Sequence, residues 1–200
     1  CACVSVHGAN RLGGNSLLET IVFGKIAGEE ASSYLQGLER KEPSEKTLLD
    51  EAMAEKKKIE AWISRTSGEK AHHLLNRLKV VMSEKVGLFR AKKELAEALE
   101  EIRQIREDYG RACLSGICLR YSQVLVNMIE FASMLDLTEV ITLGALRREE
   151  TRGSHYRLDF PLRNDADWLK HTLVTLTDGR PEVSYCPVRV TKYQPEERKY

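Results

Sequence analysis

The sequence has no apolar run long enough to span a bilayer, so we expect any link to a membrane to go through another protein. It also lacks an excess of charge of one sign, because 31 Lys and Arg residues balance 30 Asp and Glu residues and the formal net charge is +1. Such a balance gives no general attraction to nucleic acid or to an anionic membrane surface. We therefore predict no nucleic-acid partner.

Cysteine is sparse and follows no regular framework. The five cysteines are Cys1, Cys3, Cys113, Cys118 and Cys186. This odd number argues for free thiols in a reducing compartment. No histidine or further cysteine lies at the spacing of a zinc or iron–sulfur site, so we interpret the cysteines as buried small residues and predict no metal site.

The remaining composition is ordinary for a globular chain, with 42% of the 200 residues hydrophobic and 30% charged. This length is enough for one domain or for a domain with an appendage. The chain begins with Cys1 rather than methionine, inside an apolar run over residues 1–6 that we expect to be a strand. We therefore expect the sequence to be a piece of a longer protein.

A glycine-rich loop followed directly by a helix is the most informative stretch. The loop contains Gly8, Gly13 and Gly14, and Ser16 and Glu19 behind it have the spacing of a capping box. The residues that follow are apolar almost all round the expected helix, namely Leu17, Leu18, Ile21, Val22, Phe23 and Ile26. This pattern predicts a buried helix.

Such a loop and helix start are typical of an anion site. Backbone amides at a helix N-terminus point outward, and the helix dipole favours negative charge there. Arg11 lies inside the loop, and its planar guanidinium suits a carboxylate gripped by two parallel hydrogen bonds. The residues alone leave a second interpretation equally open, in which the stretch is a plain turn with a surface arginine.

The middle of the chain has the apolar spacing of amphipathic helices. We predict helices over residues 44–63, 69–85, 89–109 and 122–148, and the short joins predict that the last three form an antiparallel bundle. Asp136 and Glu139 repeat the capping-box spacing, which marks a place where the last helix could break. After Pro161, residues 171–176 and 182–190 predict a β-hairpin around the turn at 177–180.

Two segments resemble one protein family. His7–Leu17, with the sequence HGANRLGGNSL, closely resembles a motif of succinate dehydrogenase and fumarate reductase flavoprotein subunits. The segment 148–161 is similar to that family's ESRGAH…R.D.P segment, with Thr151 and Ser154 as departures. L-aspartate oxidase is a relative, but it tends to carry Met-Ala-Ser where this chain has Leu-Gly-Gly at 12–14. The resemblance is thinnest over residues 29–66.

This resemblance implies a mainly α chain with three parts. Residues 1–42 would be the end of an FAD-binding domain, built as strand, loop and buried helix. Residues 43–150 would be a helical domain with an antiparallel three-helix bundle, and residues 151–200 a C-terminal extension with the β-hairpin.

The resemblance also implies a function, the FAD-dependent interconversion of succinate and fumarate. Arg11 would bind and polarise one carboxylate of the dicarboxylate substrate, and the amides of Ser16 and Leu17 would contact the flavin. The partners would be an iron–sulfur subunit, which passes electrons toward quinone, and membrane-anchor subunits. The location would be cytoplasmic, peripheral on the inner face of the membrane. Because the family's proton-transfer residues lie upstream, we assign no catalytic residue and expect the chain alone to be inactive and to bind FAD weakly or not at all.

Two other functions and one polar cluster stay open at this point. The alternatives are an L-aspartate oxidase-type flavoenzyme and a non-catalytic helical interaction module formed by the charged bundle. The module would leave the glycine-rich loop and Arg11 without a purpose. Arg152, His155 and Arg157 form a cluster that either docks a domain near the flavin or supplies cations at a helix C-terminus.

Overall fold

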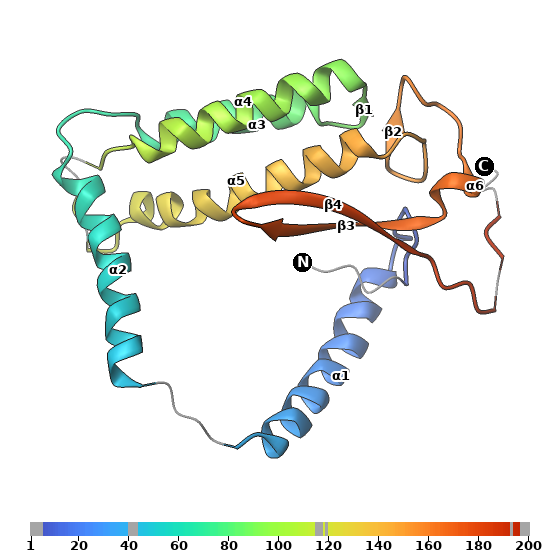
Figure 1. The fold of residues 1–200 in the computed structure, drawn as a ribbon, viewed down its shortest axis with the longest axis horizontal. Helices are drawn as coiled ribbons and strands as arrows, with labels where there is room; N and C mark the ends of the chain where they lie inside the picture. Colours follow the sequence, from blue (N-terminus) through green and yellow to red (C-terminus); the bar gives the residue numbers. More distant parts are fainter. Residues whose placement is uncertain (1–5, 40–43, 115–117, 119, 193, 197–200) are drawn as a thin grey trace.

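The computed structural model describes residues 6–39, 44–114, 118, 120–192 and 194–196, which form a layered helical body with two long helical arms (Figure 1). The body contains α3 (Ala71–Lys85), α4 (Lys92–Gly110) and α5 (Gln123–Arg147), with a β-hairpin lying along α5. The arms are α1 (Asn15–Gly37) and α2 (Glu45–Ser64). The predicted fold class, mainly α with a C-terminal hairpin, is confirmed, whereas most of the strand expected over 1–6 lies outside the described residues.

The three helices of the body share one hydrophobic core. Trp62, near the end of α2, packs against it, and Leu74, Leu95 and Met128 are each 0% exposed. Buried side chains recur three or four positions apart on each helix, as the spacing predicted. They are Leu74, Leu78 and Val81 on α3; Leu95, Ala98, Leu99, Ile102 and Ile105 on α4; and Met128, Phe131, Leu135, Thr142 and Ala145 on α5.

Serine caps define the starts of α2 and α5. The Ser44 hydroxyl accepts a hydrogen bond from the amide of Thr47 at 3.1 Å, and the Ser122 hydroxyl accepts one from the amide of Leu125 at 3.2 Å. Each hydroxyl satisfies one of the backbone donors that a helix start leaves unpaired. The two starts lie within a residue of their predicted positions.

The helix α5 runs without interruption past Asp136, so a break there is wrong. Asp136 and Glu139 accept hydrogen bonds from the Arg106 guanidinium on α4, at 2.7 and 3.0 Å. Residues three apart lie on the same helix face. The two carboxylates therefore join α5 to α4 instead of capping a new helix.

A short parallel strand pair links two connections of the body. β1 (Phe89–Arg90) pairs with β2 (Tyr156–Arg157), and the rings of Phe89 and Tyr156 meet edge to face with centroids 5.4 Å apart. The helix predicted from residue 89 therefore starts only at Lys92, after this pair. The pairing joins the segment that follows α5 in the chain to the connection between α3 and α4.

The C-terminal hairpin has the predicted form. β3 (Lys170–Thr177) and β4 (Arg180–Pro187) pair antiparallel, and they follow the short helix α6 (Asp165–Trp168). Asp178 and Gly179 form the two-residue turn with φ values of 50° and 75°, as a type I′ hairpin turn requires. The Tyr185 hydroxyl donates to the backbone oxygen of Arg147 at 3.1 Å, which ties the hairpin to the end of α5.

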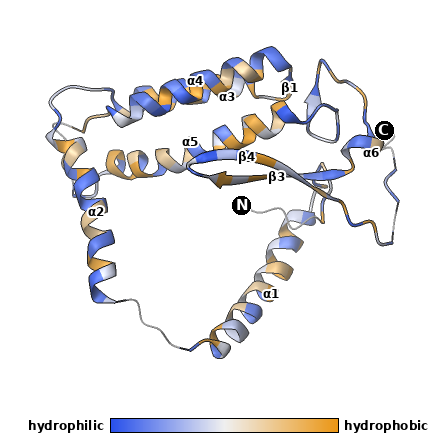
Figure 2. Cartoon of the chain, in the orientation of Figure 1, coloured by the Kyte–Doolittle hydropathy of each residue, from blue (hydrophilic) through white to orange (hydrophobic). Residues whose placement is uncertain are grey.

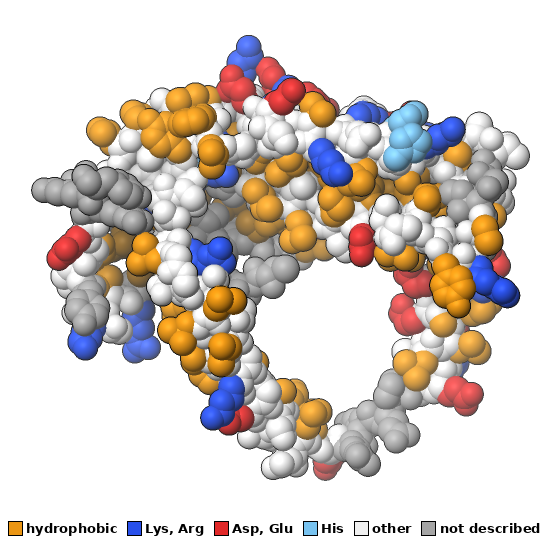
Figure 3. Space-filling model, turned by 180° about the vertical axis from the view of Figure 1, so that it is seen from behind, with side chains coloured by type: hydrophobic (Ala, Val, Ile, Leu, Met, Phe, Trp, Pro, Cys, Tyr) orange, Lys and Arg blue, Asp and Glu red, His pale blue; other side chains and the backbone are white. Residues whose placement is uncertain are grey.

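The arm α1 is exposed, and the prediction of a buried helix is wrong for this structure. None of its residues is buried, and Leu17 and Ile21 are each 72% exposed. Hydrophobic residues run along both arms in Figure 2, and Figure 3 shows their side chains on either side of the opening between the arms. An apolar helix is buried only where another element supplies an opposing surface. A Cβ on Gly24 or Gly28 would meet nothing within 4 Å, so the close approach expected there is also not observed.

The described cysteines only partly fit their prediction. Cys113 is buried, whereas Cys118 and Cys186 are exposed, and all three are free. Exposed positions on a loop and on a hairpin edge carry no apolar periodicity, so no local pattern separated them from Cys113. Among the helices that the structure describes, none has the length and hydropathy needed to cross a membrane.

Candidate functional site

The loop before α1 depends on left-handed backbone at two glycines. Gly8 has a φ of 64° and Gly14, directly before the helix, has a φ of 81°. Side chains are disfavoured in this conformation, which glycine adopts readily. Asn15 donates its amide to the Leu12 carbonyl oxygen at 3.3 Å, and this turn delivers the chain into the first turn of α1.

The start of α1 leaves backbone donors available. The Leu18 amide bonds to the Gly14 carbonyl oxygen, but the amides of Ser16 and Leu17 have no acceptor among the described residues. No side chain caps the helix, so the predicted capping box of Ser16 and Glu19 is wrong. Two free amides at the positive end of the helix dipole are suited to a negative ligand atom.

Glu19 pairs instead with a histidine of the loop. The Glu19 carboxylate contacts His7 Nε2, twelve residues earlier in the chain. The other ring nitrogen, Nδ1, is buried and has no hydrogen-bond partner within the described part of the chain. Sequence reasoning did not single out His7. Its place at the head of the loop motif was the available signal.

Arg11 lies in the exposed part of the same loop. Within the described residues its guanidinium has no hydrogen-bond or ion-pair partner. A free guanidinium retains all of its donors for a planar carboxylate. The structure thus presents Arg11, Ser16 and Leu17 together on one loop and helix start, all three with unused donors.

A segment far along the chain contacts this loop by hydrogen bonds. Both the amide and the hydroxyl of Ser154 donate to the Ala9 carbonyl oxygen, each at 3.2 Å. Gly153 lies so close that a Cβ on it would come within 2.4 Å of that oxygen. Sequence reasoning missed this contact, because nothing in local spacing links positions 145 residues apart.

Four residues before Ser154, the chain has a buried carboxylate that accepts hydrogen bonds from several groups. Glu150 is 0% exposed and accepts hydrogen bonds from Arg148 at 2.6 Å, from Arg152 at 2.7 Å and from the Asn164 amide at 3.1 Å. Burial disfavours its charged form, but the bonds from Arg152, Asn164 and Arg148 outweigh burial and hold its pKa below the usual value. Arg152 also donates to Asp165 at 2.6 Å.

The contacts of Arg157 favour the second interpretation of the polar cluster, in which it supplies cations at a helix C-terminus. Arg157 is 0% exposed, and its Nη1 donates to the backbone oxygens of Ala145, Leu146 and Arg148 at 2.9, 3.1 and 2.9 Å. These carbonyls belong to the end of α5 and the residue after it, so Arg157 is a cation at a helix C-terminus.

His155 supports the same helix end. Its Nδ1 accepts a hydrogen bond from Arg90 at 2.9 Å, and its Nε2 donates to the Arg148 carbonyl oxygen at 3.2 Å. Burial lowers the pKa of His155, and the nearby guanidinium groups lower it further despite the bond to Arg148. A neutral ring with the proton on Nε2 satisfies both contacts.

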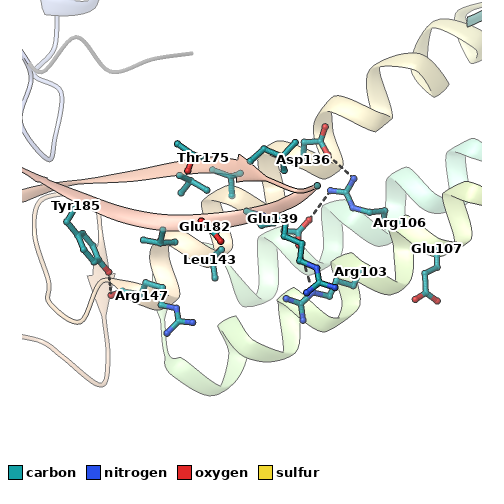
Figure 4. Close-up of a pocket in the computed structure, with 17 residues that line it drawn as sticks. Arg103, Arg106, Glu107, Asp136, Glu139, Leu143, Arg147, Thr175, Glu182 and Tyr185 are labelled. Atoms are coloured by element: carbon teal, nitrogen blue, oxygen red, sulfur yellow. Dashed lines mark hydrogen bonds and ion pairs between the residues drawn. The ribbon is translucent and has the colours of Figure 1, made fainter. Parts of the chain in front are cut away.

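A groove of about 1240 Å³ lies elsewhere, between α4, α5 and the hairpin. Figure 4 shows Arg106 directed toward Asp136 and Glu139 along its wall. Arg103 and Arg106 on α4 pair there with Asp136 and Glu139 on α5, which links the two helices. The loop with its unused donors is therefore the better candidate for ligand chemistry.

The sequence of this chain is similar to one family of known proteins, the family that the loop motif resembles. Residues 75–200 match the family model described as fumarate reductase flavoprotein C-term. A fumarate reductase flavoprotein subunit of Mycobacterium tuberculosis is 36% identical over 203 aligned positions, covering 100% of this chain and 35% of the relative. A succinate dehydrogenase flavoprotein subunit of Coxiella burnetii is 35% identical, covering 95% of this chain and 31% of the relative.

A solved structure has the same fold. A quinol fumarate reductase mutant of E. coli superposes with a TM-score of 0.88 at 28% identity, covering 98% of this chain and 34% of that chain. The fold and the loop define the C-terminal region of a flavoprotein subunit. The chain belongs to the fumarate reductase and succinate dehydrogenase flavoprotein family and spans about a third of the length of the curated relatives it matches.

Proposed function

We propose that this chain is the C-terminal part of a flavoprotein subunit that interconverts succinate and fumarate with FAD. Residues 1–42 would complete the FAD-binding domain, residues 43–150 form the helical domain, and residues 151–200 form the C-terminal extension. The observation that carries the proposal is the set of unused donors on one short segment, the Arg11 guanidinium and the amides of Ser16 and Leu17. The family membership supports the same function.

The helix start fits the polar edge of a flavin. Among the described residues the amides of Ser16 and Leu17 have no acceptor, and a Cβ on Gly13 or Gly14 would meet nothing within 4 Å, so a planar group can approach the backbone closely. FAD, when bound, supplies the two-electron hydride chemistry of the reaction. The amides would hold the flavin edge and stabilise negative charge on it through the dipole of α1.

Arg11 would bind one carboxylate of the dicarboxylate substrate. Its fork of donors matches the two oxygens, and its fixed positive charge would stabilise charge that develops on that group during the reaction. Arginine cannot be replaced by lysine here without loss, because an ammonium is a point charge that does not reproduce the planar geometry.

The partners would be an iron–sulfur subunit and membrane-anchor subunits, through which electrons pass to and from quinone. Support comes from the solved E. coli relative, which is a quinol fumarate reductase. The proposed location is cytoplasmic and peripheral on the inner face of the membrane, held there by the partner subunits.

The test is Arg11→Gln in the full-length flavoprotein subunit within its complex. We expect kcat/KM for succinate and fumarate to fall by about 10²- to 10³-fold with unchanged FAD content, as for loss of one charge-stabilising donor. Arg11→Lys should restore only part of the activity. Arg120→Gln, which removes another exposed guanidinium outside the loop, should behave as wild type. Wild-type activity in Arg11→Gln would refute the proposal, and an aspartate-dependent oxidase activity of the wild-type protein would favour the L-aspartate oxidase alternative.

A further inference from the structure

The Gly153–Ser154 segment contacts the loop before α1, here called the ligand loop because it carries Arg11. The contact is made at one backbone atom of that loop. The Ala9 carbonyl oxygen accepts two hydrogen bonds, from the Ser154 amide and the Ser154 hydroxyl, both at 3.2 Å. Ala9 is two residues before Arg11, so any movement of this carbonyl is transmitted to the loop that carries the guanidinium. The other end of the loop is already fixed by the first turn of α1.

The contact at Gly153 is so close that an added side-chain atom would disturb it. Its φ is 59°, and a Cβ at this position would lie 2.4 Å from the Ala9 oxygen, 2.6 Å from the Ala9 carbonyl carbon and 2.9 Å from the Ala9 Cβ. Two of these three atoms are backbone, so they can move away only if the loop itself shifts. Glycine is required here both by its conformation and by the space.

The segment is itself rigidly supported from the body. Arg152 and His155 exchange two backbone hydrogen bonds, at 2.8 and 3.0 Å, around the tight turn that contains Gly153 and Ser154. On one side Arg152 is bonded to the buried Glu150, and on the other His155 is bonded to Arg90 and to the end of α5. The turn is therefore an extension of the helical body rather than a free loop.

We propose that Gly153 and Ser154 are positioning residues that set the placement of Arg11 by holding the Ala9 carbonyl. This inference rests on the proposed function of Arg11 in binding a dicarboxylate. The helical body, which carries none of the assigned ligand contacts, in this way fixes the geometry of the ligand loop. Displacement of a binding group by about 1 Å can cost ~10²-fold in rate, so a backbone clash two residues away is expected to be measurable.

The test uses the full-length flavoprotein subunit with Gly153→Ala and the matched control Gly179→Ala. Gly179 also has a positive φ, 75°, but a Cβ there would meet nothing within 4 Å, so the control carries similar backbone strain without the contact. In a second pair, Ser154→Ala removes the hydroxyl that contacts Ala9, and the control Ser184→Ala removes a hydroxyl from the hairpin. Two quantities are measured in each variant: amide hydrogen exchange of residues 7–17, and the Kd for malonate, a dicarboxylate probe, from the flavin absorbance.

We expect Gly153→Ala to speed exchange in residues 7–17 and to raise the malonate Kd by about tenfold or more, which corresponds to ~1.4 kcal/mol. Ser154→Ala should raise the Kd by roughly two- to fivefold, as for one neutral hydrogen bond. Gly179→Ala and Ser184→Ala should match wild type in both measurements. In an Arg11→Gln background, Gly153→Ala should add little to the Kd, because its effect acts through Arg11.

The inference is overturned if Gly153→Ala leaves the exchange of residues 7–17 and the malonate Kd at the values of Gly179→Ala. If Gly153→Ala does not fold, the Ser154→Ala and Ser184→Ala pair decides, and equal values in that pair overturn it. A wild-type protein that does not bind malonate refutes the proposed function instead. The exchange data then still decide whether the turn holds the loop.

Discussion

The helical body and the arm α1 are both rich in apolar residues but use them differently. In the body, Leu95 is 0% exposed and lies in a core shared by three helices, whereas Leu18 on α1 is 62% exposed. The sequence predicted an all-round apolar, buried helix for α1 and amphipathic helices for the body. The body supplies its own opposing surfaces, whereas α1 has none among the described residues and is attached through the loop at its start.

The contrast in burial can be tested by removing a leucine from each region. Leu95→Ala should lower the free energy of unfolding by about 2–5 kcal/mol, because it deletes fully buried methyl groups and leaves a cavity. Leu18→Ala should change it by no more than about 0.5 kcal/mol, as for an exposed position. Urea unfolding of the 200-residue chain, followed by circular dichroism, measures both. Equal losses in the two variants would contradict the contrast.

A smaller effect is expected where the body meets the ligand loop. Glu150→Gln should lower the free energy of unfolding by about 1–3 kcal/mol, because two guanidinium groups lose a charged acceptor in a buried place. The control is Glu149→Gln, the exposed neighbour, which should stay within about 0.5 kcal/mol of wild type. Thermal unfolding of both variants checks this, and a neutral outcome for Glu150→Gln would remove the carboxylate as an anchor of the turn.

The smallest effect is a pH dependence from His155. Burial, reinforced by nearby cations, lowers its pKa in the folded protein, so the unfolded chain binds a proton first on acidification. Stability from this group is therefore fully present above about pH 6.5, the ordinary histidine pKa, and is lost as the pH falls toward the folded value. We expect the free energy of unfolding to fall by only a few tenths of a kcal/mol between about pH 6.5 and 5.5, because solvent screens the partly exposed ring. His155→Gln should remove this component, whereas His72→Gln at an exposed position should keep it, and an unchanged slope in His155→Gln would contradict the assignment.

Much of the fold was predictable because its signals are local. Spacing of three and four residues located the helices of the body, and the turn residues at 177–180 located the hairpin. Each of these features depends on neighbours within one or two turns of backbone. The loop with Arg11, Ser16 and Leu17 was also found by local pattern, and the resemblance to a family gave it a function.

Three of the errors share a cause, which is competition between a local partner and a distant one. Glu19 had the spacing to cap α1 but pairs with His7, and Asp136 had the spacing to start a helix but pairs with Arg106. A carboxylate takes whichever donor the fold delivers at the better geometry, and spacing along the chain does not contain that information. Residues 89–91 left the predicted helix for the same reason, because β1 found a partner beyond α5.

The helices of the body, the hairpin and the family could be read from the sequence, because hydrophobic period, turn chemistry and a long motif are all carried by consecutive residues. The contacts by which Arg157 caps α5, Glu150 anchors a turn and Ser154 holds Ala9 became visible only in the folded chain. These contacts join segments whose meeting depends on how the elements pack. Whether an apolar helix is covered depends on that same packing, and for this reason the sequence predicted burial for α1 that the structure does not show.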